Sequence, residues 1–235
     1  MRIAVIPARG GSKRIPRKNI KPFIGRPMIA WSIAAAQQSG CFDRIIVSTD
    51  DPEIAEVAKM HGADVPFVRP LELADDHTGT IPVIAHAIGW QNAQGKPEVS
   101  QACCVYATAP FLRAHDLRRG LEVLESSGAD YAFSVTSYAF PIQRALRITP
   151  DQRMSMFQPE HFNTRSQDLE EAWHDAGQFY WGKAKAWLTG SPLFSEGSTS
   201  IVLPRRRVQD IDTPEDWARA ELMFKCLELY SKENL

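Results

Sequence analysis

Short apolar runs alternate with helical repeats over the first 135 residues of the chain. Runs rich in β-branched residues favour strands, and apolar positions three or four residues apart favour helices. The strands predicted in this way cover residues 3–6, 44–48, 65–68, 102–106 and 131–135. The helices predicted between them cover residues 27–39, 52–62, 80–92 and 114–126. Because alternating strands and helices are joined by right-handed crossovers, this pattern predicts an α/β fold with a mostly parallel sheet.

The alternation breaks between residues 136 and 175. The large apolar residues of this stretch, which follow no helical period, are Tyr138, Phe140, Met154, Met156, Phe157, Phe162 and Trp173. Because a lone hairpin would expose these side chains, we expect a small excursion that packs on a second copy of the chain, giving a homodimer. A disordered loop is the alternative, although such loops normally lack aromatic residues. Strands are predicted again at 178–182 and 199–203, and Thr213 caps a final helix that runs to about Tyr230.

Composition excludes several classes of partner. The 235 residues include 27 basic and 28 acidic ones, a formal net charge of −1, so neither nucleic acid nor a membrane surface is an expected partner. The length suits one domain spanning residues 1–235. The cysteines form no C-x-x-C pair and are expected to be buried free thiols of a reducing compartment. The first residues enter an apolar strand without a cleavage signal, so we expect a cytoplasmic protein.

The strongest candidate for chemistry follows the first predicted strand. Residues 8–19 read Ala-Arg-Gly-Gly-Ser-Lys-Arg-Ile-Pro-Arg-Lys-Asn, and seven Lys or Arg residues without one acid lie between Arg9 and Arg26. The paired glycines let the backbone approach a ligand closely, and cations around such a loop suit a polyphosphate. The spacing fits neither a P-loop nor a dinucleotide fingerprint. A basic loop that is merely solvated is the alternative.

A second candidate site lies near the other end of the chain, in Asp210-Ile211-Asp212. On an extended segment the two carboxylates face the same way, roughly 6.5–7 Å apart, and Ile211 points toward the core. Two such carboxylates can hold Mg²⁺, which also keeps waters and substrate phosphates in its shell. The alternative, in which Asp212 only favours the N-terminus of the next helix, explains one aspartate but not the pair.

Five segments occur in an order and at intervals that resemble the cytidylyltransferases that activate nonulosonic acids, a family that includes the CMP-sialic acid synthetases. They are Ala8-Arg9-Gly10-Gly11-Ser12-Lys13, Lys18-Asn19, Val47-Ser48-Thr49-Asp50, Arg69-Pro70 with Leu73-Ala74-Asp75-Asp76, and Asp210-Ile211-Asp212. The resemblance covers essentially the whole chain. It implies a Rossmann-like sheet of the nucleotide-diphospho-sugar transferase type, CTP as one substrate, an acidic nine-carbon sugar as the other, and Mg²⁺ as the cofactor.

The resemblance also implies roles for individual residues. Those implied to bind the nucleotide are Ala8, Arg9, Gly10, Gly11, Ser12, Lys13, Lys18, Asn19, Arg69 and Thr80. Arg9 and Lys18 are expected nearest the charge that develops at the α-phosphate. Asp210 and Asp212 are the expected metal ligands, so that Lys18, Arg9 and Asp212 form the expected catalytic group.

The acceptor half departs from the sialic acid pattern. Residues 106–110 read Tyr-Ala-Thr-Ala-Pro where those enzymes usually have Gln-Pro-Thr-Ser-Pro, and residues 174–177 read His-Asp-Ala-Gly in place of Arg-Pro-Asn-Gly. These stretches and Phe140-Pro141-Ile142-Gln143-Arg144-Ala145 resemble the pseudaminic acid branch. The residues implied to touch the sugar are Tyr106, Thr108, Gln143, Arg144, His174, Gln178 and Phe179. Aromatic surface from Tyr106, Phe179 and Tyr180 suits a sugar with fewer hydroxyl groups.

We therefore expect transfer of CMP from CTP to the anomeric hydroxyl of a nonulosonic acid, with pseudaminic acid preferred, and release of pyrophosphate. The same reaction on N-acetylneuraminate, legionaminate or a related sugar acid is the nearest alternative. A non-catalytic nucleotide-binding protein is an alternative of another class, although mere binding does not require the aspartate pair. A glycosyltransferase would need an aspartate pair early in the nucleotide half.

Overall fold

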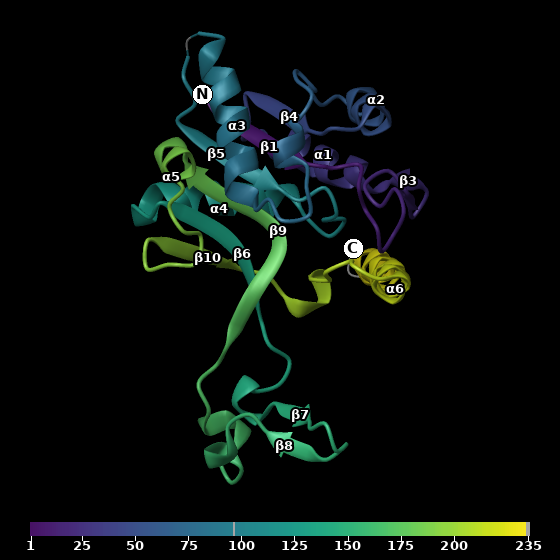
Figure 1. Cartoon of the computed structure of the whole chain (residues 1–235), viewed down its shortest axis with the longest axis vertical. Coiled ribbons are helices and arrows are strands. Elements are labelled where there is room, and N and C mark those ends of the chain that lie inside the picture. The colour runs from purple at the N-terminus through teal and green to yellow at the C-terminus, as the bar shows by residue number, and fades with distance from the viewer. Residues whose placement is uncertain (96, 234–235) are drawn as a thin grey trace.

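The computed structural model describes residues 1–95 and 97–233, and a six-stranded sheet forms its centre. The strands are β1 (Arg2–Pro7), β4 (Arg44–Ser48), β5 (Gln101–Val105), β6 (Tyr131–Ser137), β9 (Trp173–Lys183) and β10 (Ser198–Val202). Their spatial order is β10-β6-β9-β5-β1-β4 (Figure 1). Strand β9 runs antiparallel to both of its neighbours, and the other adjacent pairs are parallel. The prediction of an α/β fold with a mostly parallel sheet is confirmed.

Helices cover both faces of this sheet. They are α1 (Met28–Ser39), α2 (Pro52–Met60), α3 (Thr80–Ala93), α4 (Ala114–Ser127), α5 (Ala184–Thr189) and α6 (Pro214–Glu233). Apolar residues of α1, α2 and α4 form one core with one face of β1 and β5, and residues of α3 and α5 form a second core with the opposite face. This division follows from the alternation of side chains along a strand. Helix α6 packs apart from both cores, against a short hairpin of β2 (Pro22–Phe23) and β3 (Arg26–Pro27).

The predicted strand at residues 65–68 is wrong. Asp64, just before this stretch, forms a single bridge to Ile46 of β4, and residues 65–68 run as a loop. Pro66 offers no backbone N–H for a ladder, and the side chain of Val68 is 77% exposed. The loop continues through a short 3₁₀ turn, η1 (Leu71–Leu73), to the start of α3. Helix α5 was not predicted, because six residues are too few to show a helical period.

The excursion between β6 and β9 projects away from the body of the molecule (Figure 1). It consists of a two-stranded hairpin, β7 (Leu146–Ile148) and β8 (Met154–Met156), and the 3₁₀ turns η2 (Ile142–Arg144), η3 (Pro159–His161) and η4 (Ser166–Asp168). The hairpin excursion that the sequence predicts is therefore present. Its large apolar side chains are mostly exposed, among them Phe140 and Phe162.

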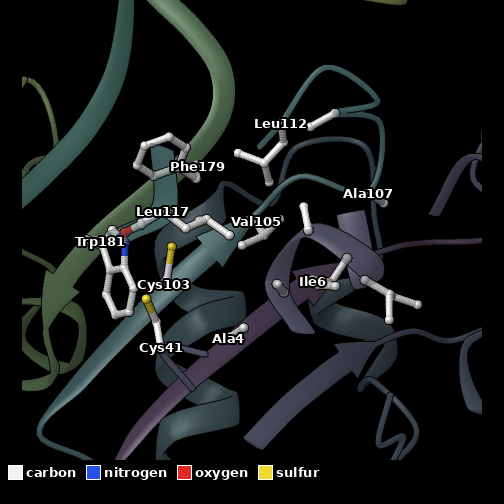
Figure 2. Close-up of a cluster of buried hydrophobic side chains, with 14 of the residues drawn as sticks. Ala4, Ile6, Cys41, Cys103, Val105, Ala107, Leu112, Leu117, Phe179 and Trp181 are labelled. Carbon is white, nitrogen blue, oxygen red and sulfur yellow. Dashed lines mark hydrogen bonds between the residues drawn. The ribbon is translucent and has the colours of Figure 1, made fainter. Parts of the chain in front are cut away.

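The cysteines differ in their surroundings. Cys41, Cys103 and Cys104 are buried free thiols, as predicted, whereas Cys226 on α6 is exposed. Figure 2 shows Cys41 and Cys103 in the core between the sheet and its helices. Across the described ranges, no helix is both long enough and apolar enough to cross a bilayer.

Packing between α4 and β9 leaves no room for a side chain at Gly120. A Cβ placed there would lie 2.6 Å from Phe179 Cε2 and 2.7 Å from Trp181 Cδ1. Overpacking of this kind costs about 1–3 kcal/mol, against which alanine's better helix propensity returns about 1 kcal/mol. We expect Gly120→Ala to lower the free energy of unfolding by up to about 2 kcal/mol, measured by urea denaturation.

Gly89 in α3 offers a matched control for that substitution. It is exposed, and a Cβ added there would meet no atom within 4 Å. Gly89→Ala should therefore raise stability by about 0.5–1 kcal/mol, since only the helix propensity changes. Equal shifts for the two variants would contradict the packing described for Gly120.

Candidate active site

The basic loop after β1 is fixed in place by backbone hydrogen bonds. The N–H of Ala8 donates to the carbonyl of Ser48, and that of Gly10 donates to Asp50 Oδ1 at 3.0 Å. A Cβ at Gly10 would lie 2.6 Å from Asp51 Oδ2, so this close approach requires glycine. Farther along, Asn19 Nδ2 donates to the carbonyl of Arg9 at 3.0 Å and closes the loop on itself. The loop is therefore a preformed ring at the C-terminal end of β1.

Arg17 ties this loop to helix α2. Its guanidinium binds Asp51 through two nitrogens and also contacts Glu53. Asp51 is the N-cap of α2, where it accepts hydrogen bonds from the backbone N–H groups of Glu53 and Ile54. The hydrogen bond from Arg17 is the main reason that the pKa of Asp51 lies below its usual value. Arg17 itself has a φ of 57°, a left-handed conformation that this anchoring stabilises.

Lys18 brings the two ends of the chain together. Its Nζ donates to the carbonyl of Ile211 at 2.7 Å and to Asp212 Oδ1 at 3.2 Å. Arg14 Nη2 lies 2.8 Å from the other carboxylate oxygen, Asp212 Oδ2. Ile211 is buried against α6, as expected, so the segment is anchored where Asp212 faces the basic loop. The predicted meeting of the basic loop and the aspartate segment thus occurs.

A cavity of about 650 Å³ opens between these parts. Its charged lining residues are the cations Arg9, Lys13, Arg14, Lys18 and Arg69 and the acids Asp76 and Asp212. Ser12, Asn19, Thr80, Tyr106 and Thr108 also line it. The cavity sits at the C-terminal ends of β1 and β5, where open α/β sheets bind ligands. The excess of cations over acids fits a polyphosphate.

Arg69 is the most buried of these cations, with 4% of the residue exposed. Its Nε donates to Ser48 Oγ at 3.0 Å, and its Nη2 donates to the Ser48 carbonyl. Burial lowers the pKa of Arg69 to about 10, so the guanidinium stays charged at neutral pH. Because these hydrogen bonds hold the Arg69 guanidinium in the cavity wall, its positive charge attracts an anionic ligand to the cavity.

The acidic pair expected to hold a metal is Asp210 and Asp212, of which Asp212 lines the cavity. Desolvation, and after it repulsion from Asp212, raises the pKa of Asp210. Two carboxylates that repel one another fit a divalent cation, which would relieve the repulsion. No cluster of three or more His, Cys, Asp or Glu side chains exists in the described parts of the chain. Two carboxylates supply only part of the shell of a divalent cation, so water and phosphate oxygens would have to complete it.

The prediction that Phe179 touches the sugar is wrong. Its side chain is fully buried beside Trp181 and Leu117, in the core shown in Figure 2. Successive side chains of a strand face opposite sides of the sheet, so Tyr180 faces the other core, where its ring centroid lies 5.2 Å from that of Tyr106.

Four other residues expected at the sugar do not line the cavity in this chain. Gln143 and Arg144 lie in η2 of the excursion, where they bind the Glu170 carbonyl and Ser166 Oγ respectively. His174 packs against Tyr138 at the base of the excursion, with ring centroids 4.8 Å apart. The buried Gln178 donates from Nε2 to the Arg207 carbonyl at 2.6 Å, and its Oε1 has no protein partner.

A second, smaller cavity of about 300 Å³ shares Gly79, Thr80 and Tyr106 with the first. Its other lining residues are Ile81, Pro82, Asp175, Tyr180, Leu193 and Phe194. Tyr106 Oη and Thr80 Oγ1 lie 3.3 Å apart, and Tyr180 Oη donates to Asp175. The surface is mainly aromatic and aliphatic with a few hydroxyls. Nothing in the sequence around Leu193 and Phe194 pointed to this position.

Comparison with known proteins places this architecture among the nucleotidyltransferases. A solved structure of CMP:2-keto-3-deoxy-manno-octonic acid synthetase in complex with CTP is similar in fold, with a TM-score of 0.69 at 18% identity over 95% of this chain and 98% of that one. The cytidylyltransferase family model matches residues 3–196, and the chain belongs to that family.

Two curated relatives match at nearly full length. A pseudaminic acid cytidylyltransferase of Campylobacter jejuni (serotype O:23/36, strain 81-176) is 44% identical over 95% of this chain and 96% of its own length. The CMP-N,N'-diacetyllegionaminic acid synthase of Legionella pneumophila is 34% identical over the same shares of the two chains. The resemblance inferred from the motifs is confirmed.

Proposed function

We propose that this protein transfers CMP from CTP to the anomeric hydroxyl of a nonulosonic acid, with pseudaminic acid as the preferred acceptor. The observation that carries the proposal is the contact of Lys18 with Asp212 at a cavity lined by five cations. The 44% identity to the pseudaminic acid enzyme of Campylobacter jejuni supports the choice of acceptor.

The Lys and Arg side chains of the cavity contribute most to this reaction, by positioning the phosphates and neutralising their charge. The anomeric oxygen attacks the α-phosphorus of CTP as its proton passes to solvent, and the bond from that phosphorus to the bridging oxygen breaks, so pyrophosphate leaves with the electron pair. Lys18 and Arg9 offset charge at the α-phosphate, while Ser12 and Lys13 bind the β- and γ-phosphates. Such transfer depends on positioning and charge neutralisation rather than on a covalent nucleophile.

Asp210 and Asp212 would hold Mg²⁺. When bound, the metal neutralises phosphate charge and polarises oxygen ligands. In the protein described here Asp212 is held instead by Arg14 and Lys18. These two cations hold the carboxylate at the cavity, and they would be available to phosphate oxygens if the carboxylate bound a metal instead.

The smaller cavity supports an acceptor with apolar substituents. Pseudaminic acid carries two acylamino groups and a terminal methyl. The aromatic and aliphatic surface of Tyr106, Tyr180, Leu193 and Phe194 suits these groups better than it suits a polyhydroxylated chain. Tyr106 and Thr108 line the larger cavity and Tyr106 also lines the smaller one, which supports assigning these two residues to the junction of sugar and nucleotide.

A panel of acceptors tests this choice. Pseudaminate, legionaminate and N-acetylneuraminate are each incubated with CTP and Mg²⁺, and pyrophosphate release is measured to obtain kcat/KM. We expect pseudaminate to lead by at least about tenfold, the scale of one or two apolar contacts. A lead for legionaminate or N-acetylneuraminate would reassign the acceptor. CTP binding without turnover on any acid would favour the non-catalytic alternative.

Homodimerisation through the excursion completes the proposal. Phe140, Phe157 and Phe162 are each more than 60% exposed there, and large exposed apolar patches mark interaction sites. We expect light scattering at micromolar concentration to give twice the chain mass of 26.3 kDa. Phe157→Ser with Phe162→Ser should shift the protein toward monomer. Leu229→Ser, an exposed apolar position on α6, is the control that should stay dimeric. A monomeric wild type would contradict this proposal.

A further inference from the structure

An acid at the edge of the cavity is bound to two of the cations proposed to hold the triphosphate. Asp76 contacts Arg9 Nη1 through Oδ1 and Lys13 Nζ through Oδ2, the latter at 2.5 Å. These two cations lower the pKa of Asp76 to about 2, chiefly through the hydrogen bond from Lys13. One carboxylate thus bridges two side chains of the basic loop from a distant part of the chain.

The turn that carries Asp76 is stabilised without it. The neighbouring Asp75 accepts hydrogen bonds from the backbone N–H groups of His77 and Thr78 at 3.0 and 2.6 Å. Thr78 Oγ1 donates to the carbonyl of Glu72 at 3.1 Å. Asp76 makes no hydrogen bond of this kind within the turn among those of the described residues. Its carboxylate is therefore directed across the cavity edge rather than used to fold the loop.

Apart from Arg69, the charged side chains of the cavity lining form two groups, each with one acid and two cations. Asp212 pairs with Arg14 and Lys18 on one side, and Asp76 pairs with Arg9 and Lys13 on the other. The proposed metal gives Asp212 a separate partner once substrate binds. Asp76 has no such partner, and a phosphate oxygen that takes the N–H groups of Arg9 and Lys13 now bound to Asp76 would displace its carboxylate.

We propose that Asp76 is an internal counter-anion of the triphosphate site, which nucleotide displaces on binding and which returns to Arg9 and Lys13 as pyrophosphate leaves. This inference rests on the proposed function, because it assumes that both cations bind phosphate. The carboxylate keeps the two long side chains in position and free of mutual repulsion before CTP arrives. It competes with the ligand for the same donors, so it weakens the binding of CTP and of pyrophosphate alike.

The test is Asp76→Asn, which keeps the size of the side chain and removes its charge. Arg9 is partly exposed and Lys13 largely exposed, so both ion pairs are weak, and we expect Kd for CTP and for pyrophosphate to fall by about three- to tenfold. Calorimetric titration measures both, with and without Mg²⁺. Inhibition by added pyrophosphate should become stronger by the same factor, and KM for CTP should fall.

Two further variants separate charge competition from structural effects. Glu56→Gln removes one acid from an exposed ion pair on α2, outside the cavity lining, and should leave both Kd values unchanged. Asp76→Glu keeps the charge and should bind CTP within about twofold of the wild type, because the competing anion is retained.

Weaker or unchanged binding of CTP and pyrophosphate by Asp76→Asn would overturn the inference. Weaker binding only with Mg²⁺ would also overturn it, and would make Asp76 a contributor to metal binding. Failure of the proposed function is a separate result: the wild type itself would bind neither CTP nor pyrophosphate. Wild-type binding with no gain in Asp76→Asn would leave the proposed function intact and remove this role of Asp76.

Discussion

Lys18→Ala should lower kcat by about 10²–10³-fold with CTP saturating, the scale of losing one positioned donor in a preorganised site. Lys18 is the residue of the basic loop that touches both the Ile211 carbonyl and the Asp212 carboxylate. Its ammonium lies where loop, metal segment and α-phosphate are proposed to meet. The measurement is steady-state pyrophosphate release with pseudaminate as the acceptor.

The control for this variant is Lys59→Ala, which removes a lysine from an exposed pair with Glu56 on α2. Turnover by the control should match the wild type. Calorimetry with CTP shows whether Lys18→Ala still binds the nucleotide. Retained binding with low turnover indicates a lost catalytic cation, whereas lost binding indicates a lost nucleotide site. Unchanged kcat in Lys18→Ala would remove Lys18 from the mechanism.

Asp212→Asn is the second variant for which we expect a large loss. Removing one of the two carboxylates of the proposed metal site should reduce turnover by about 10²–10³-fold at moderate Mg²⁺, because a bound metal would supply several kcal/mol of charge stabilisation. Its ion pairs with Arg14 and Lys18 are partly exposed, so the free energy of unfolding should change by no more than about 1 kcal/mol. We therefore expect Asp212→Asn to lose most of its turnover while its free energy of unfolding stays close to that of the wild type.

Titrations with Mg²⁺ and with Mn²⁺, the latter followed by electron paramagnetic resonance, read the metal site independently of activity. Asp210→Asn should weaken Mn²⁺ binding in the same way as Asp212→Asn. Glu215→Gln, an exposed acid in the first turn of α6, should leave metal binding as in the wild type. Full Mn²⁺ affinity in both aspartate variants would exclude this pair as the metal site.

Much of the fold could be predicted from local signals. Asp51 caps α2, and Gly40 ends α1 in a left-handed conformation, because these positions have strong intrinsic preferences. The apolar run at 65–68 predicts a strand that does not form, because Pro66 has no N–H to donate within a sheet. The antiparallel direction of β9 could not be predicted either, because the long excursion before it hides the geometry of the connection.

Site residues that belong to a sequence motif could be predicted, whereas residues whose position depends on packing could not. The glycine loop and the Asp210–Asp212 segment are sequence patterns, and the structure brings Lys18 and Asp212 together. The assignment of Phe179 failed because a one-residue step on a strand moves a side chain to the opposite face. No sequence pattern indicates the ion pairs of Arg17 and Asp76, because their partners lie 34 to 67 residues away in the chain.

The reaction itself is tested most directly by ³¹P NMR of CTP, Mg²⁺ and pseudaminate incubated with the wild-type protein. The account predicts that the three CTP resonances give way to free pyrophosphate and one phosphodiester signal in equal molar amounts, only when the sugar acid is present. Persistence of intact CTP although it binds, or conversion to CMP without an acceptor, would contradict a cytidylyltransferase built around Lys18 and Asp212.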